Sequence, residues 1–352
     1  MADRGKQIRR GTATVLGVGA VVGVGLAAER AFVRKDKARP DPYKDERYGD
    51  VRGEAIGPVA TSDGTLLHVE GSGSGEITLA LSHGFSLGCT LWHHQVLGLA
   101  GDARIVTFDH RGHGRSGRPP TNDWTLTALA RDIDAVISDA APNGRVVLVG
   151  HSMGGMAALE YARLFPEKIG TTVAGLVLVD TTAADVMGGM LPAGRRIAAA
   201  LQGLQEVVMR ALAGRVDAVD RLRRNGSTVA YLGTRVMGFG PNPSPSQVAF
   251  IERLLADTPS EVWLSLIPTI MGFDLSDVLP NINVPVLIIV GSHDRLTPPH
   301  AAERMAFALP QAELAVIEGA GHTSMVERPD EFNQHIREFL TRVEAASKLA
   351  AP

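Results

Sequence analysis

The strongest chemical feature of the sequence is a serine flanked by glycines, in the run Gly150-His151-Ser152-Met153-Gly154. An apolar run typical of a β-strand, residues 146–149, precedes it, and a helical pattern follows. Gly-x-Ser-x-Gly between a strand and a helix is typical of a sharp turn that exposes the serine hydroxyl at a helix amino terminus. The partial positive charge there favours the negative charge that develops when a hydroxyl attacks a carbonyl. We therefore predict that Ser152 is a nucleophile.

A serine is a weak nucleophile unless a base removes its proton. Among the histidines, His322 is placed best, because it follows the last predicted strand, residues 313–317, on a glycine-rich loop that can reach back over the sheet. A carboxylate at a strand end would orient this histidine. Asp294, in the loop directly after residues 286–290, is the favoured acid, and Asp180, at the end of the preceding strand, is the alternative.

The elements that would position these side chains alternate between strand and helix patterns. Such alternation indicates βαβ units and an α/β fold, with a mostly parallel central sheet flanked by helices. The middle strands are continuous apolar runs, as expected for strands buried on both faces. The predicted strands are residues 66–70, 77–82, 104–109, 146–150, 176–180, 286–290 and 313–317, and the predicted helices are 126–138, 153–165, 301–309 and 329–343.

A long insertion separates the fifth of these strands from the sixth and favours helices. Residues 197–212 carry apolar side chains at three- and four-residue steps, the spacing of an amphipathic helix. We interpret residues 183–280 as a helical cap over a core formed by residues 58–182 and 281–345. Residues 41–57, which are polar and contain proline, are predicted to be a linker.

Methionines gather in the predicted cap and beside the candidate nucleophile. Because methionine fills irregular apolar spaces and adapts to varied ligands, they indicate an apolar, tolerant acyl pocket under the cap. Packing of the cap helices would explain the same residues equally well. The candidate pocket residues are His83, His151, Met156, Met187, Met190 and Met325.

Four further motifs accompany the serine motif along the predicted core. They are Ser82-His83-Gly84-Phe85, the run Phe108–Ser116 with the pattern Asp-x-Arg-Gly-x-Gly-x-Ser, Gly291–Asp294 with Thr297-Pro298, and Gly321-His322 with Glu327-Arg328-Pro329. Together they resemble the α/β-hydrolase family, in particular its lid-bearing esterases, haloperoxidases and carbon–carbon bond hydrolases. The order Ser, Asp, His is also the family order. The resemblance covers about residues 58–340 and implies the α/β-hydrolase fold with an inserted helical cap.

The same resemblance implies an oxyanion hole made by two backbone N–H groups, those of Phe85 and Met153. Family members that process halogens or epoxides use an aspartate nucleophile, and these reactions are disfavoured because position 152 is serine. Haloperoxidase-like members often have proline directly after the oxyanion turn, where this chain has Ser86. This difference disfavours a perhydrolase.

The predicted function is a serine hydrolase that cleaves a carboxylic ester, with an apolar or lipid-like acyl group, through an acyl-enzyme intermediate. The alternative is a carbon–carbon bond hydrolase or a haloperoxidase/perhydrolase-like enzyme of the same fold. A ligand-binding protein with little turnover is less favoured, because it would have no use for a complete Ser, Asp and His set. The expected partner is a small-molecule ester, and the mechanism requires no metal or organic cofactor.

The composition excludes several other classes of protein. Hydrophobic residues make up 45% and charged residues 21% of the chain, which is typical of a globular protein and not of a disordered one. A net charge of −3 gives no basic face for nucleic acid. The single cysteine, Cys89, excludes an internal disulfide framework and a cysteine-rich metal site.

The first forty residues depart from this average. Residues 11–28 carry no charged side chain, are rich in glycine and alanine, and have basic residues on both sides. An uncharged stretch of about 18 residues can cross a bilayer. We predict an uncleaved membrane anchor within residues 1–40, which would make the protein membrane-associated in an orientation that the flanking charges leave open. A cleaved secretory signal or a loose soluble helix is the alternative.

Overall fold

The computed structural model describes residues 31–142, 144–184 and 228–350. An eight-stranded sheet with the order β1-β2-β4-β3-β5-β6-β7-β8 forms its centre. β2 pairs antiparallel with β1 and with β4, and all other neighbours pair in parallel. The carboxyl ends of β3 to β8 therefore meet at one edge of the sheet. The strands are β1 Glu54–Ala60, β2 Leu66–Ser72, β3 Ile77–Ser82, β4 Arg104–Phe108, β5 Arg145–His151, β6 Val173–Val179, β7 Val286–Gly291 and β8 Ala312–Ile317.

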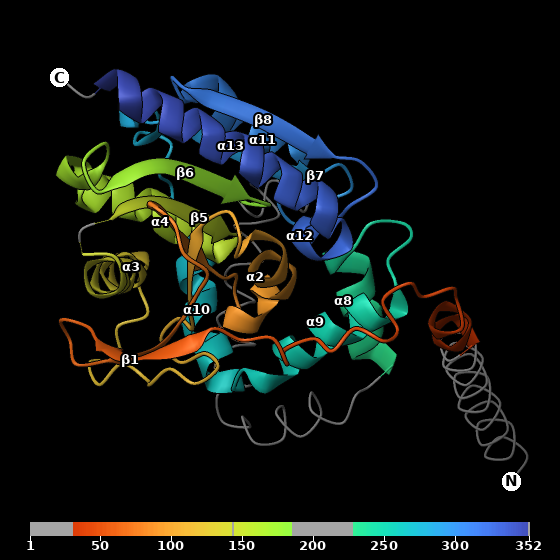
Figure 1. Cartoon of the computed structure of the whole chain (residues 1–352). Coiled ribbons are helices and arrows are strands. Elements are labelled where there is room, and N and C mark those ends of the chain that lie inside the picture. The colour runs from red at the N-terminus through yellow and green to blue at the C-terminus, as the bar shows by residue number, and fades with distance from the viewer. Residues whose placement is uncertain (1–30, 143, 185–227, 351–352) are drawn as a thin grey trace, which may run out of the picture.

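Helices cover both faces of this sheet (Figure 1). α3, α4 and α11 contribute to the apolar core on one face, and α2, α12 and α13 contribute to the core on the other. Residues 31–37 are helical, and the α-helices that follow are α2 His93–Leu99, α3 Leu126–Ala140, α4 Met153–Leu164, α8 Thr228–Gly238, α9 Pro245–Asp257, α10 Ser260–Met271, α11 Pro299–Ala308, α12 Ser324–Glu327 and α13 Pro329–Ala350. Short 3₁₀ turns are η1 Cys89–Trp92, η2 Pro166–Lys168 and η3 Leu279–Asn281.

The apolar runs of the sequence explain why the central strands lie between two helical layers. Successive side chains of a strand point to opposite faces. In β5, Val146 and Leu148 pack into one core cluster, whereas Val147 and Val149 pack into the other. The predicted fold, a mostly parallel sheet flanked by helices, is therefore confirmed.

In the residues that precede β2, the structure differs from the sequence prediction. β1 was not among the predicted strands and begins at Glu54, inside the predicted linker, residues 41–57. The residues ahead of β1 also pack on the helices of the predicted cap. Asp41 accepts hydrogen bonds from the backbone N–H and the hydroxyl of Ser246, both at 2.8 Å, and Tyr48 stacks on Phe250 with 4.4 Å between ring centroids. Much of this segment is therefore held against α9.

The described part of the predicted cap, residues 183–184 and 228–280, carries α8, α9 and α10. Figure 1 shows α8 and α9 next to each other, on the side of the molecule where the first described residues lie. The apolar stripe of residues 197–212 lies outside the described residues.

The prediction of a membrane anchor, and of membrane association through it, is wrong for the part of the chain that the structure describes. No helix within residues 31–142, 144–184 and 228–350 is long and apolar enough to cross a bilayer. Residues 11–28, from which the prediction came, lie outside the described residues.

Candidate active site

Ser152 lies on the sharp turn between β5 and α4, at the carboxyl edge of the sheet. Its φ of +52° and ψ of −117° are unusual for a residue with a side chain, so the local backbone is strained. The turn requires glycine on both sides. A Cβ atom at Gly154 would lie 2.3 Å from the carbonyl oxygen of Ser82, and one at Gly150 would lie 2.5 Å from the carbonyl oxygen of Gly154. The spacing of the serine motif is therefore explained by close backbone contacts.

The predicted base lies next to this serine, and the favoured acid lies next to the base. The Nε2 atom of His322 is 3.0 Å from the Oγ atom of Ser152, and its Nδ1 atom is 2.9 Å from the Oδ2 atom of Asp294. His322 and Asp294 are both buried. The structure thus brings together three side chains from three loops that are far apart in the sequence.

The Asp294 carboxylate is held from its other side by its own loop. Its Oδ1 atom accepts the backbone N–H groups of Leu296 at 2.8 Å and Thr297 at 2.9 Å, and its Oδ2 atom accepts the Thr297 hydroxyl at 2.6 Å. Thr297 therefore fixes the orientation of the carboxylate that faces His322. Thr297 belongs to one of the motifs that resemble the α/β-hydrolase family, but this role of its side chain is visible only in the structure.

Charge coupling within this pair changes both pKa values. Burial raises the pKa of Asp294, but the positive charge of His322 and the hydrogen bonds from His322 and Thr297 lower it more, so it lies below the ordinary value. Burial lowers the pKa of His322, but the Asp294 carboxylate outweighs burial and raises it above the ordinary value of 6.5. Asp294 therefore stays ionised beside a histidine whose basicity is increased.

Asp180, the alternative acid, has other partners. Its Oδ1 atom accepts the Gly291 backbone N–H at 2.9 Å, and its Oδ2 atom accepts the backbone N–H and the hydroxyl of Ser324 at 3.0 and 2.7 Å. Burial, followed by the nearby charge of Asp294, raises the pKa of Asp180 to about 7. Asp180 therefore joins β7 to the start of α12, and the geometry favours Asp294 as the partner of His322.

A cavity of about 210 Å³ opens beside Ser152 and His322. Its walls are mainly apolar and come from the turn after β3, from α8, from α9 and from the loop after β7. The lining residues are Phe85, Leu87, His151, Ser152, Gly233, Thr234, Met237, Gly238, Ile251, Leu255, Leu296, His322 and Thr323. Helices of the predicted cap thus form one side of the space in front of the serine.

The predicted pocket residues have different locations. His151 lines the cavity, and its Nε2 atom lies 2.8 Å from the backbone carbonyl oxygen of His322. His83, Met156 and Met325 are buried and do not line the cavity, so this part of the prediction is corrected. The methionines face the packed interior, where they contribute to the two core clusters. Met187 and Met190 lie outside the described residues.

The two backbone groups predicted to form an oxyanion hole flank the serine. Met153 is the first residue of α4, where backbone N–H groups have no partner within the helix. Phe85 follows Gly84, and a Cβ atom at Gly84 would lie only 3.2 Å from the Cβ atom of Ser152. The turn that carries Phe85 therefore lies directly against the nucleophile turn.

Glu327 is a further site residue whose contacts the sequence did not predict. Its side chain is buried, and its two oxygen atoms accept the backbone N–H groups of Gly321 at 2.6 Å and of Gly240 at 3.0 Å. Gly321 precedes His322, and Gly240 follows α8. One carboxylate thus connects the histidine loop with the predicted cap.

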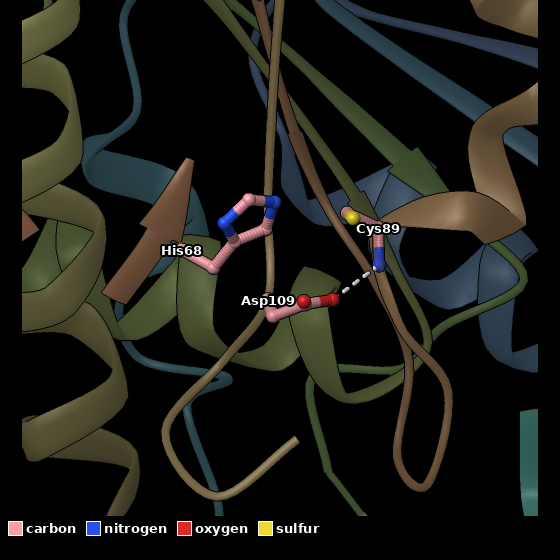
Figure 2. Close-up of side chains that lie close together, drawn as sticks. All are labelled: His68, Cys89 and Asp109. Carbon is pink, nitrogen blue, oxygen red and sulfur yellow. Dashed lines mark hydrogen bonds between the residues drawn. The ribbon is translucent and has the colours of Figure 1, made fainter. Parts of the chain in front are cut away.

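Within the described ranges, one group of side chains has the spacing of metal ligands, formed by His68, Cys89 and Asp109 (Figure 2). Their donor atoms already have other roles. The Nε2 atom of His68 is 2.8 Å from Glu70, and the two oxygen atoms of Asp109 accept the backbone N–H groups of Cys89 and Arg115 at 2.7 and 2.9 Å. Burial raises the pKa of the Cys89 thiol, which keeps it protonated. We therefore interpret this group as a connection between loops.

Comparison with known proteins agrees with this geometry. A family model described as the alpha/beta hydrolase fold matches residues 78–329. The chain belongs to the α/β-hydrolase family. The RutD protein of Rhizobium rhizogenes, assigned as a carbamate hydrolase, is 29% identical over 272 residues, which cover 75% of this α/β-hydrolase and 92% of the relative.

Two solved structures are similar over most of their length. A thermophilic esterase from Thermogutta terrifontis has 29% identity and a TM-score of 0.65, covering 82% of this α/β-hydrolase and 98% of that chain. Est816, described as an N-acyl homoserine lactone degrading enzyme, has 28% identity and a TM-score of 0.60. The match covers 80% of this α/β-hydrolase and 100% of that chain. Family and relatives together support a hydrolase activity.

Proposed function

We propose that this α/β-hydrolase is a serine carboxylesterase that works through an acyl-enzyme intermediate. The observation that carries the proposal is the continuous chain of contacts from Ser152 through His322 to Asp294, with distances of 3.0 and 2.9 Å. A nucleophile, a base and an orienting carboxylate at these distances form the arrangement required for acyl transfer. The similar esterase structure supports the same reaction class.

In this mechanism His322 accepts the Ser152 proton at Nε2 while Oγ attacks the ester carbonyl carbon. The oxyanion that forms is held by the backbone N–H groups of Phe85 and Met153. The C–O bond to the alcohol breaks, and the leaving oxygen takes the proton from His322. Water then repeats these steps on the acyl-enzyme, giving its proton to His322, and releases the acid and free Ser152.

The cavity supports an apolar ester as the substrate class. Its walls include Leu87, Met237, Ile251, Leu255 and Leu296, which favour an apolar acyl group. A volume of about 210 Å³ is smaller than the ~300–1,000 Å³ of pockets for drug-sized ligands. We therefore expect butyrate and hexanoate esters to be better substrates than acetate esters, because a longer apolar chain buries more surface.

A fluorophosphonate probe tests the nucleophile directly, because it reacts with activated serines. The full chain should be labelled at Ser152, and Ser152→Ala should lose labelling and at least about a thousandfold in kcat. Ser265→Ala is a matched control, since that hydroxyl donates to the Glu261 carbonyl within α10. Ester turnover by Ser152→Ala at the wild-type rate would contradict the proposal.

The acyl preference is tested with p-nitrophenyl acetate, butyrate, hexanoate and palmitate. Butyrate or hexanoate should give the highest kcat/KM. A clear preference for acetate would contradict the proposed acyl pocket but not the serine mechanism, because labelling of Ser152 reports the mechanism separately.

A further inference from the structure

Two buried histidines outside the proposed Ser-His-Asp chain contact the turn that carries Phe85. This turn is closed by a hydrogen bond from the Leu87 backbone N–H to the Gly84 carbonyl, at 3.2 Å. Its third residue, Ser86, has a φ of +58°, a region that favours glycine. Such a conformation persists only where surrounding contacts over-determine it. The side chains that contact this turn therefore decide whether it keeps this conformation.

His83 holds the first peptide of the turn, and its contacts identify its tautomer. The backbone N–H of His110 donates to the Nε2 atom of His83 at 2.9 Å. Because a backbone N–H can only donate, Nε2 carries no proton, and the proton of the neutral ring is on Nδ1. Nδ1 lies 2.8 Å from the Gly84 carbonyl oxygen and donates to it.

His113 holds the next peptide in the same manner. The backbone N–H of Ser86 donates to the Nε2 atom of His113 at 3.2 Å. The proton of this ring is therefore also on Nδ1, which donates to the Arg111 carbonyl oxygen at 3.0 Å. His83 and His113 thus hold the two peptide groups on either side of the Phe85 Cα atom.

Both rings must stay neutral for these contacts to exist. A second proton would place a ring N–H against a backbone N–H in each case. The surroundings oppose that proton, because complete burial lowers the pKa of His83 to about 4 and that of His113 to about 3. The tautomers found from the hydrogen bonds are consistent with this burial.

We propose that His83 and His113 are positioning residues that aim the Phe85 backbone N–H at the oxyanion. The inference rests on the proposed function and extends it. In a trans peptide, the carbonyl of one residue and the N–H of the next point in opposite directions, so the bond from His83 to the Gly84 carbonyl sets the direction of the Phe85 N–H. The bond from Ser86 to His113 prevents the following peptide from rotating.

Matched substitutions at position 83 separate positioning from packing. Asn carries a donor close to the place of Nδ1, and Gln carries an acceptor close to the place of Nε2. His83→Asn therefore keeps the bond to Gly84, whereas His83→Gln keeps the bond from His110. Each variant loses one buried hydrogen bond and should be destabilised to a similar extent.

The two variants should differ in rate. In His83→Gln, kcat should fall by at least about tenfold with KM little changed, because loss of one oxyanion donor costs about 10² to 10³ in kcat. His83→Asn should recover most of that loss.

The pattern should be reversed at position 113. His113→Gln keeps an acceptor for the Ser86 N–H, whereas His113→Asn keeps only the donor to Arg111. His113→Asn should therefore lose kcat, and His113→Gln should recover it. Ser86→Gly in the His113→Asn background should restore part of the rate, because glycine adopts a positive φ without strain.

A second measurement needs no substitution at either histidine. Long-range ¹H–¹⁵N spectra of the full chain should show His83 and His113 as neutral rings protonated at Nδ1. Rings protonated at Nε2, or charged at neutral pH, would overturn the proposal. Equal kcat losses for the Asn and Gln variants at both positions would also overturn it. That result is expected if the two histidines act only by filling space. Failure of the esterase proposal would be seen separately, as Ser152→Ala activity equal to that of the wild type.

Discussion

The role of Asp294 can be tested by Asp294→Asn, which replaces one carboxylate oxygen with an amide NH₂ and changes little else. The backbone N–H groups of Leu296 and Thr297 can only donate, and both reach the Oδ1 position, at 2.8 and 2.9 Å. The amide oxygen of Asn must occupy this position if both bonds are to survive. The NH₂ group then occupies the Oδ2 position, 2.9 Å from the Nδ1 atom of His322.

This orientation reverses the tautomer of His322. A donor facing Nδ1 forces the ring proton onto Nε2, which then faces Ser152 and can no longer accept its proton. The wrong tautomer costs about 10⁴ in kcat, or about 5.5 kcal/mol. Flipping the amide would preserve the tautomer but leave two buried N–H groups facing NH₂, at about 1–3 kcal/mol each. Flipping therefore costs about 2–6 kcal/mol in total, and the wrong tautomer costs about 5.5 kcal/mol. Because the lower of the two costs sets the loss, we expect kcat to fall by about thirtyfold to ten-thousandfold.

The assay is the hydrolysis of p-nitrophenyl butyrate by the full chain, with circular dichroism to show that the variant is folded. Asp180→Asn is the matched control, because its carboxylate is equally buried but bonds Gly291 and Ser324. Asp180→Asn should be less stable than the wild type, but its kcat should fall by less than about tenfold. A folded Asp294→Asn variant with kcat within about tenfold of wild type would refute the assignment of Asp294. A larger loss in Asp180→Asn would favour the alternative acid.

Two further predictions concern the loop that carries His322. His322 must be unprotonated to accept the Ser152 proton, and its pKa is raised. Therefore kcat/KM should increase with pH and reach half its maximum above pH 6.5. A pH-rate profile with its midpoint below pH 6.5 would contradict this. Glu327→Gln should lower the free energy of unfolding by about 1–3 kcal/mol, because one of the N–H groups of Gly321 and Gly240 would face an NH₂ group. Thermal denaturation measures this loss, and an unchanged melting temperature would show that the carboxylate does not hold the two segments together.

Much of the fold could be predicted because its determinants are local in the sequence. A continuous apolar run such as residues 146–149 is compatible with a strand buried on both faces, and the glycines around Ser152 are needed by a turn only a few residues long. By contrast, β1 is mostly exposed and lacks such a run, so its pairing with β2 decides its structure.

The sequence by itself therefore determined the family, the parallel sheet and the candidate residues Ser152, His322 and Asp294 or Asp180. Only the tertiary structure decided which carboxylate reaches His322, because both follow adjacent parallel strands and differ only in where their loops turn. It also placed α8 and α9 beside the serine, brought the His110 N–H to His83, and brought His113 to the Phe85 turn. These contacts join residues far apart in the chain, and they depend on how whole layers pack, which no local pattern of residue types records.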